Sequence, residues 1–279
     1  MSARPLLVVD GDSLAHRAYH ALPKTFRRAE GKPGNALLGF SNFLVRLWES
    51  EQPRAVLVGW DSLDAPTYRH ELFAGYQGGR EFDAELLEQL DLLPELVRAF
   101  GFTAAKAAGY EADDFLAAAV KQEEERGGSV LVVTSDRDSF QLASAQTTIL
   151  QPTRGVSQLA RVGPAEVHER YGVDPAQVPD FIALRGDPSD RLPGAKGVGP
   201  KTAADLLRQY GSLEAALDGG RFAAQADELR VYRQMATLDA SAPLSEIDDQ
   251  EPTWGQASTF VRELGLNALA DRLAALASA

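Results

Sequence analysis

Short apolar runs alternate with amphipathic stretches in the N-terminal part of the chain. The runs rich in Val and Leu, which predict buried strands, are residues 6–9, 55–58, 130–133 and, more weakly, 148–150. The stretches with apolar residues at helical spacing are 36–48, 82–100 and 113–126. This alternation predicts an α/β fold, with a central, mostly parallel, twisted sheet that is covered by helices on both faces.

The pattern changes between residues 165 and 180, where the strand signals fade. The helical segments that follow are 200–210, 213–217 and 259–276. We therefore predict two domains, an α/β domain over 1–175 and an all-helical domain over 176–279. Residues 241–254 contain prolines and acids and are predicted to form a surface loop.

Composition limits the class of protein. The chain has 279 residues, 44% of them apolar, and no cysteine, which excludes disulfides and thiolate chemistry. No apolar run approaches the roughly 20 residues that a membrane helix needs, so we expect a soluble, cytoplasmic protein without a membrane partner. The net charge of -12 argues against a nucleic-acid partner, unless many acids gather in one cation-binding cleft.

Acidic residues follow three of the predicted strands. Asp10 ends the first apolar run, Asp61 follows the second, and Asp136 and Asp138 follow the third. Ligands of open α/β sheets bind beyond the carboxyl ends of the strands, so we expect these side chains to converge. A single strand-end Asp is as often a helix cap or turn residue. A group of them repels itself, and hard divalent cations such as Mg²⁺ or Mn²⁺ relieve that repulsion.

Two further segments add acids. Glu111, Asp113 and Asp114 open a predicted helix, and Asp187 and Asp190 lie in a turn-rich stretch. Each segment alone has an ordinary explanation, because acids in a first helical turn oppose the helix dipole and Asp is common in turns. Their occurrence together with the strand-end acids favours one shared metal site.

Five blocks of sequence together resemble a known family. They are VDGDSLAHRAYHA (9–21), YRHELFAGY (68–76), GYEADD (109–114), TSDRD (134–138) and GDPSDRLPG (186–194). They are similar to the signature blocks of bacterial 5′-nucleases, the flap endonucleases and the 5′-exonuclease portion of DNA polymerase I. The resemblance implies a PIN-like fold with a helical arch, a C-terminal helix-three-turn-helix element, and a monomer that acts on branched or gapped duplex DNA with a 5′ flap.

The resemblance also implies a set of acidic residues that holds two divalent ions, directly or through waters. The set is Asp10, Asp61, Glu111, Asp113, Asp114, Asp136, Asp138, Asp187 and Asp190. Two such ions would support hydrolysis of DNA phosphodiester bonds. His16 and His20 lie four residues apart but stay outside this set, because packing or a phosphate contact explains them better than metal binding.

The block YQGGR (76–80) supplies the other catalytic candidates, Tyr76, Gln77 and Arg80. Relatives usually carry Lys where this chain has Gln77, so one cation is missing from the implied arch. Arg80 would then carry more of the contact with the scissile phosphate, although a solvated arginine is the ordinary alternative. In the following helix, Leu86, Leu90, Leu93 and Val97 have a spacing that predicts packing, and only the resemblance suggests a lid.

The sequence LPGAKGVGPKT (192–202) leads into a predicted helix and has the composition of a phosphate cradle. An ordinary helix cap explains it equally well. By resemblance it is the helix-three-turn-helix, which would bind the DNA backbone, with a possible K⁺ on its loop carbonyls. The residues assigned to DNA contact are Lys196, Gly197, Gly199, Lys201, Thr202, Arg17, Lys24 and Arg69. Lys24 belongs to a basic stretch, 24–32, for which a solvated loop is the alternative.

Three functions remain open. The leading one is a structure-selective 5′-3′ exonuclease or flap endonuclease of DNA replication and repair. The second is a DNA-binding scaffold with weakened catalysis, suggested by Gln77 and disfavoured by the complete acidic set. The third is a PIN-type ribonuclease, disfavoured by the loop at 197–202. The chain has no polymerase-like region, which suggests a stand-alone enzyme, although a piece of a longer polymerase would look the same.

Overall fold

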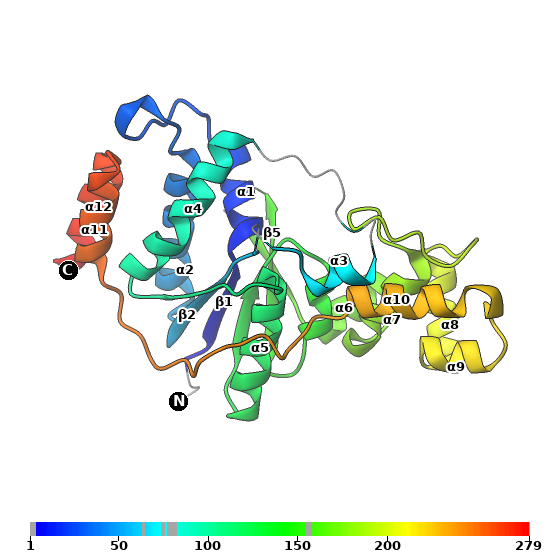
Figure 1. Ribbon diagram of the computed structural model, residues 1–279. Helices are drawn as coiled ribbons and strands as arrows, with labels where there is room; N and C mark the ends of the chain where they lie inside the picture. Colours follow the sequence, from blue (N-terminus) through cyan, green and yellow to red (C-terminus); the bar gives the residue numbers. More distant parts are fainter. Residues whose placement is uncertain (1–3, 63–64, 74–75, 77–82, 155–157, 279) are drawn as a thin grey trace.

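A six-stranded sheet forms the centre of the computed structural model, which describes residues 4–62, 65–73, 76, 83–154 and 158–278 (Figure 1). The strands are β1 (Leu6–Asp10), β2 (Ala55–Gly59), β3 (Thr103–Ala105), β4 (Val130–Val133), β5 (Thr147–Arg154) and β6 (Gln158–Val162). Their order is β3-β2-β1-β4-β5-β6, parallel except for β6, which pairs antiparallel with β5. The predicted α/β class is confirmed. The sequence did not predict β3 and β6, because a three-residue strand and a polar edge strand give little apolar signal.

The helices of the described residues either cover the two faces of this sheet or extend away from it (Figure 1). They are α1 (Gly11–Ala21), α2 (Asn35–Glu51), α3 (Tyr68–Leu72), α4 (Ala84–Ala99), α5 (Ala112–Glu125), α6 (Pro164–Tyr171), α7 (Val178–Arg185), α8 (Pro200–Tyr210), α9 (Leu213–Asp218), α10 (Ala226–Ala236), α11 (Trp254–Glu263) and α12 (Asn267–Ala277). In the ranges that the structure describes, none of them has both the length and the apolar character needed to cross a membrane.

The two faces of the sheet have separate apolar cores, because successive strand residues point to opposite sides. Leu6 and Val8 of β1 pack in one cluster with Phe115 of α5. Leu7 of the same strand packs in the other cluster with Phe40 of α2. Leu86, Leu90, Leu93 and Val97 of α4 are all buried in this second cluster, as their spacing predicted.

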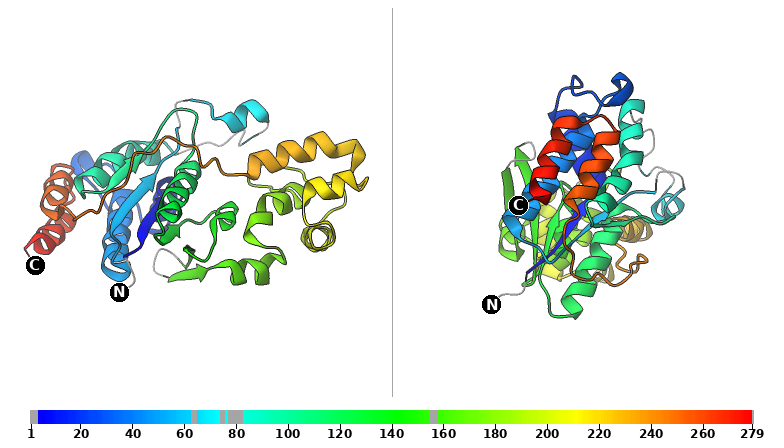
Figure 2. Two further views of the ribbon diagram at one scale, coloured as in Figure 1. Left: turned by 90° about the horizontal axis from the view of Figure 1, so that it is seen from below. Right: turned by 90° about the vertical axis from the view of Figure 1, so that its left-hand side faces the viewer.

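The helical segments of the C-terminal half lie at opposite ends of the molecule. Helices α7 to α10 form one end, whereas α11 and α12 form the other end, beside α4 (Figures 1 and 2). Val261 and Leu269 belong to the same apolar cluster as Leu7 of β1. The sequence grouped these last helices with the helical domain, but their apolar faces pack on the sheet side. The boundary between residues 175 and 176 stays a prediction.

The helix predicted over 259–276 is interrupted at Gly265, so α11 and α12 form a hairpin. Gly265 has φ +79°, and the amide of Leu266 donates to the carbonyl of Val261 at 2.9 Å, which is a glycine-terminated helix end. A Cβ at Gly265 would lie 2.7 Å from the amide nitrogen of Ala29. This close approach explains why the helix stops at a glycine.

A connecting segment, residues 237–253, joins α10 to α11 without regular structure, as predicted for most of it (Figure 1). It is not simply a surface loop. The amide of Gln250 donates to the carbonyl of Arg54 at 2.8 Å, and its side-chain oxygen accepts from the amide of Val56 at 2.9 Å. The amide of Thr253 donates to the carbonyl of Phe100 at 2.9 Å. The segment is therefore tied to the chain around the start of β2.

Candidate active site

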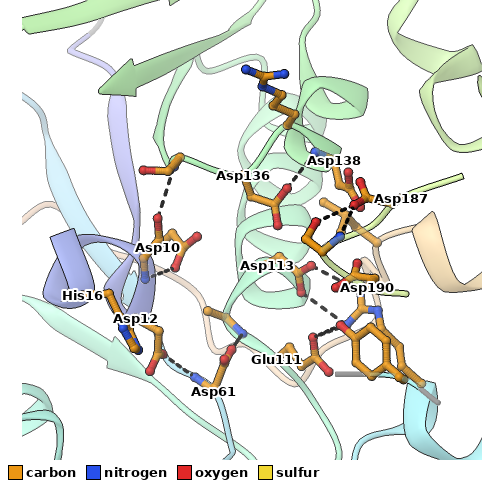
Figure 3. A pocket seen from close by; sticks show the side chains of 18 of the residues that line it. Asp10, Asp12, His16, Asp61, Glu111, Asp113, Asp136, Asp138, Asp187 and Asp190 are labelled. Carbon is orange, nitrogen blue, oxygen red and sulfur yellow. Dashed lines mark hydrogen bonds and ion pairs between the residues drawn. The ribbon is translucent and has the colours of Figure 1, made fainter. Parts of the chain in front are cut away.

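The carboxyl ends of β1, β2 and β4 meet at one edge of the sheet, and each delivers an Asp to it (Figure 3). Asp10 accepts a hydrogen bond from the amide of Ser13 at 2.9 Å and caps α1. It also accepts one from the hydroxyl of Thr134, just beyond β4, at 2.7 Å. Asp61 accepts a hydrogen bond from the amide of Ala112, at the start of α5, at 2.8 Å. The predicted convergence is therefore seen in the structure.

A second group of acids surrounds the buried side chain of Arg69, which is 1% exposed. Its guanidinium pairs with Glu111 at 3.1 Å, Asp113 at 3.4 Å and Asp114 at 2.9 Å. Its Nε also donates to the carbonyl of Met235 in α10 at 3.2 Å. One internal cation thus holds the start of α5 and connects it to the helical region.

Two predicted site residues have partners inside the protein. Arg69, assigned to DNA contact, uses its guanidinium in these ion pairs and also lines the cavity, and its role in DNA binding stays a prediction. Asp114 was assigned to the metal set, yet it is fully buried and does not line the cavity. Its carboxylate is held by Arg69 and accepts hydrogen bonds from the amides of Glu111 at 3.1 Å and Asp239 at 2.9 Å. The physical reason is that its oxygens face the interior, where they order the start of α5.

The remaining acids come from the turn after β4 and from the segment after α7. The amide of Asp138 donates to Oδ1 of Asp136 at 3.0 Å, which closes a tight turn. Asp187 accepts a hydrogen bond from the amide of Ser189 at 2.8 Å and lies 3.4 Å from a guanidinium nitrogen of Arg185. Asp190 also faces the cavity (Figure 3).

These acids share one cavity of about 970 Å³. Of the predicted metal set, its wall contains Asp10, Asp61, Glu111, Asp113, Asp136, Asp138, Asp187 and Asp190. Burial, with smaller contributions from the charges of Asp61 and Asp136, raises the pKa of Asp10 to about 7. Burial and the charge of Asp136 raise the pKa of Asp138 well above its usual range. The cavity therefore favours any cation that can neutralise these groups.

The donors in this wall suit a divalent metal ion. They are carboxylate oxygens, which are the ligands that Mg²⁺, Mn²⁺ and Ca²⁺ prefer. Within the described ranges, no three acidic or histidine side chains already surround one point as a finished ligand cage. Mg²⁺ usually keeps several of its waters and takes only one or two carboxylates, so a wide, acid-lined cavity fits a hydrated ion.

Two family models cover most of the chain. The 5′-3′ exonuclease N-terminal resolvase-like domain matches residues 5–172, and the 5′-3′ exonuclease C-terminal SAM fold matches residues 173–257. The chain belongs to the 5′-3′ exonuclease family. The resemblance drawn from the five sequence blocks is thereby confirmed, as is the all-helical character predicted for the C-terminal region, which matches as a SAM fold.

The comparisons also place this exonuclease-family chain among known proteins. DNA polymerase I of Mycobacterium leprae is 46% identical over 215 residues, which are 76% of this chain and 24% of that protein. The chain spans about a fifth to a third of the length of the curated relatives it matches. A zinc-bound structure of T5 5′-exonuclease has a TM-score of 0.70 and 21% identity, covering 97% of this chain and 98% of the other. The T5 flap endonuclease in a pseudo-enzyme-product complex with DNA and metal ions has a TM-score of 0.68 and 21% identity, covering 99% and 100%.

Of the predicted catalytic residues of this exonuclease-family chain, the structure describes only Tyr76. Its hydroxyl donates to Oε2 of Glu111 at 2.8 Å, and its ring is buried beside the cavity. Tyr76 therefore helps to hold Glu111 in place. Gln77 and Arg80, with most of the predicted arch between α3 and α4, lie outside the described residues.

The other predicted DNA contacts fall in two places. Arg17 donates to the hydroxyl of Ser135 at 3.1 Å beside the cavity. Lys24 pairs with Asp83 and Glu85 at 2.7 Å each, at the start of α4. The residues of the second place are exposed and lie on the turn before α8 or in its first turn, namely Lys196, Gly197, Gly199, Lys201 and Thr202. Their role in DNA binding stays a prediction.

Sequence reasoning missed two acids of the cavity wall. One is Asp83, which caps α4 and pairs with Lys24, and the other is Asp12. It lies in the first turn of α1 and its Oδ2 accepts a hydrogen bond from the amide of Asp61 at 2.7 Å (Figure 3). The signal was present in the sequence, because a second carboxylate two residues after Asp10 starts a helix at the same sheet edge. It was masked because Asp in a first helical turn is ordinarily explained by the helix dipole. His16 and His20 also line this cavity.

Proposed function

We propose that this 5′-3′ exonuclease-family protein hydrolyses phosphodiester bonds of branched or gapped DNA that carries a 5′ flap, as a cytoplasmic monomer with two Mg²⁺ or Mn²⁺ ions. The observation that carries the proposal is the convergence of carboxylates from three strand ends, α5 and the segment after α7 in one cavity. Solved structures of similar fold include one with bound zinc and one with DNA and metal ions, which supports the same assignment.

Two divalent ions bound in such a cavity would supply a water of lowered pKa and would stabilise charge on the attacking and leaving oxygens. The chain's own residues hold the carboxylates in position for them. Thr134 and Ser13 fix Asp10 by hydrogen bonds, and Tyr76 fixes Glu111. In this proposal Arg80 contacts the scissile phosphate, and Gln77 offers a hydrogen bond where a cation would act more strongly.

We further propose that the turn before α8 binds the backbone of the duplex. Gly197 has φ +77°, and a Cβ there would meet nothing within 4 Å, so the backbone is open to a ligand. Lys196 and Lys201 are exposed on either side of it, and the amide of Lys196 is held by Gln225 at 3.0 Å. Contacts of this kind are independent of base sequence and weaken with salt. A K⁺ ion on the loop carbonyls would add a further contact to the DNA backbone.

One observation favours a second candidate, a DNA-binding scaffold with weakened catalysis. Gln77 brings no charge to a position where a cation would stabilise the transition state. Such a scaffold would bind the same DNA as the enzyme but would not turn it over.

A single substrate panel separates these functions. A 5′-end-labelled flap duplex and a single-stranded RNA of the same sequence are incubated with Mg²⁺, with Mn²⁺ and with a chelator. We expect a short labelled product from the DNA flap in both metals and none with chelator. Binding of the flap without cleavage in either metal would support the scaffold. Faster cleavage of the RNA would instead indicate a PIN-type ribonuclease.

A further inference from the structure

Asp12 occupies a position between two of the cavity's strand-end acids. It is half-buried in the first turn of α1, two residues after Asp10, and it lines the cavity. The family resemblance assigns it no role. Its side chain instead touches the backbone of a residue that the proposed function places among the metal ligands.

The contact is a short hydrogen bond. Oδ2 of Asp12 accepts from the backbone amide of Asp61 at 2.7 Å (Figure 3). This amide lies two residues beyond the end of β2, where the sheet no longer supplies hydrogen bonds to the chain. Asp61 in turn uses its own Oδ1 to accept from the amide of Ala112 at 2.8 Å. Asp12 thus begins a relay of two hydrogen bonds from α1 through Asp61 to the start of α5.

We propose that Asp12 is a positioning residue, which sets the place of the Asp61 carboxylate in the cavity by holding the Asp61 amide. The inference rests on the proposed function for its catalytic consequence. It does not need that function for its structural part, because the relay also orders the segment that begins α5 with Glu111 and Asp113.

The hydrogen bond, rather than the charge of Asp12, carries this role. The Asp61 amide needs only an acceptor oxygen, which Oδ2 of Asp12 supplies. An uncharged acceptor at the same place keeps the contact with the Asp61 amide. An amide side chain has such an oxygen.

The test compares Asp12→Asn, which keeps an acceptor, with Asp12→Ala, which removes it. Binding of Mn²⁺ to the full chain without DNA is measured by electron paramagnetic resonance, alongside kcat for flap cleavage. We expect Asp12→Ala to weaken Mn²⁺ binding by about 10-fold and to lower kcat by about 10- to 100-fold, the range found when partners that orient metal ligands are removed. Asp12→Asn is expected to stay within about 3-fold of the wild type on both measures.

A double-mutant cycle decides whether Asp12 acts through Asp61. Asp12→Ala is expected to cause less than about a 2-fold further loss when it is added to Asp61→Ala. An equal loss in both backgrounds would overturn the proposal, as would an Asp12→Asn variant as impaired as Asp12→Ala. If thermal melting shows that Asp12→Ala is not folded, Asp12→Leu replaces it, because leucine has a similar size and no acceptor.

Failure of the proposed function is seen separately. A wild-type protein that binds Mn²⁺ but cuts no DNA would contradict the nuclease proposal, and the Mn²⁺ affinities would still decide the role of Asp12. A wild-type protein that binds no Mn²⁺ would overturn the role of Asp12 as a positioner of a metal ligand.

Discussion

The acids in and beside the cavity include two groups that differ in what balances their charge. Glu111, Asp113 and Asp114 surround Arg69, an internal cation at 2.9 to 3.4 Å from their oxygens. Asp10 and Asp136 receive hydrogen bonds from neutral donors, the amide of Ser13, the hydroxyl of Thr134 and the amide of Asp138. Among the described residues, no ion pair of Lys or Arg with Asp10, Asp136 or Asp138 is formed, whereas the nearby Arg69 and Arg185 pair with Glu111, Asp113, Asp114 and Asp187.

The difference separates acids whose charge is balanced inside the protein from acids whose charge a bound cation or a proton must balance. Around Arg69 the protein has already placed a positive charge, and the buried cluster stabilises the start of α5 and its contact with α10. At Asp10, Asp136 and Asp138 the protein has placed carboxylates together without such a charge, which is costly unless a cation or a proton binds. We therefore expect substitution of Asp114, the member of the Arg69 group that does not line the cavity, to act mainly on stability, and substitutions in the Asp10 and Asp136 group to act mainly on metal-dependent activity.

The largest expected effect is on catalysis. Asp136→Ala removes one of the acids that have no ion pair with Lys or Arg, which we call the uncompensated group (Asp10, Asp136 and Asp138). We expect this variant to lower kcat by more than about 10³-fold while flap binding stays within about 3-fold of the wild type. Asp114→Asn is the matched variant from the Arg69 group. It should lose stability yet keep cleavage within about 10-fold of the wild type at temperatures where it is folded. Gel assays of cleavage and binding measure both variants. Near-wild-type cleavage by Asp136→Ala would contradict the distinction between the two groups of acids.

Arg69→Met tests the other side of the comparison. It leaves three carboxylates and the Met235 carbonyl without their shared donor, so we expect a loss of about 3–5 kcal/mol in the free energy of unfolding. Arg208→Met is the control, because the Arg208 ion pair with Asp205 is exposed, and its loss should cost less than about 1 kcal/mol. Urea unfolding in chelator measures both. Equal losses in the two variants would mean that the buried cluster contributes no more than a surface pair.

The pH dependence of the free energy of unfolding of the metal-free protein tests whether Asp10, a member of the uncompensated group, holds a proton. The pKa of Asp10 is about 7 in the folded state and 3.8 in an ordinary setting. Between these values the folded state binds more protons than the unfolded state, so the contribution of Asp10 to stability falls as pH rises and is constant above pH 7. This contribution is at most about 4 kcal/mol.

Urea unfolding in chelator between pH 5 and pH 8 measures it. The stability of the wild type should decline more steeply with rising pH than that of Asp10→Asn, which cannot ionise at this position. Adding Mg²⁺ at pH 8 should restore part of the lost stability, because the ion replaces the proton as the balancing charge. Identical slopes for the two proteins would show that Asp10 does not hold a proton in the metal-free state.

A smaller effect is expected from a cation supplied on the substrate side. Gln77→Lys adds a positive charge to the block that the resemblance places near the scissile phosphate, and we expect kcat to rise by about 10-fold. Gln77→Met has a similar length without charge and should give no gain. Single-turnover cleavage of the flap duplex measures the chemical step for both. Absence of a gain with Lys would mean that Arg80 or another base already fills this role.

Much of the fold and the site could be predicted because the signals were local. The apolar runs before Asp10, Asp61 and Asp136 identified three adjacent parallel strands, and the topology of such a sheet brings their ends together. The family resemblance added acids whose segments give no strand signal. The placement of α11 beside α4 was not predictable, because an amphipathic helix does not specify which apolar surface will cover it.

The sequence also did not show which acids face the cavity and which pair with an internal cation. Asp113 and Asp114 are neighbours, but successive helical residues point about 100° apart, so only Asp113 faces the cavity. Arg69 looks like a surface cation in the sequence, and only the tertiary structure shows the three carboxylates around it. Asp12 was overlooked because an acid in a first helical turn has an ordinary explanation, and because its contact with the Asp61 amide joins two segments far apart along the chain.

The smallest expected effect concerns Arg191, a cation beside the cavity acid Asp190. Arg191 is exposed and has φ +58°, a left-handed conformation that costs an L-residue about 1 kcal/mol and that Asn adopts more readily. We therefore expect Arg191→Asn to raise the free energy of unfolding by about 0.5–1 kcal/mol, measured by urea unfolding. If the cavity acids are balanced only by ions that enter the cavity, removing this exposed charge should leave kcat within about 2-fold. A larger change in kcat would show that Arg191 helps to balance the charge of the acids. The acids of the segment after α7 would then belong with those that a cation of the protein balances.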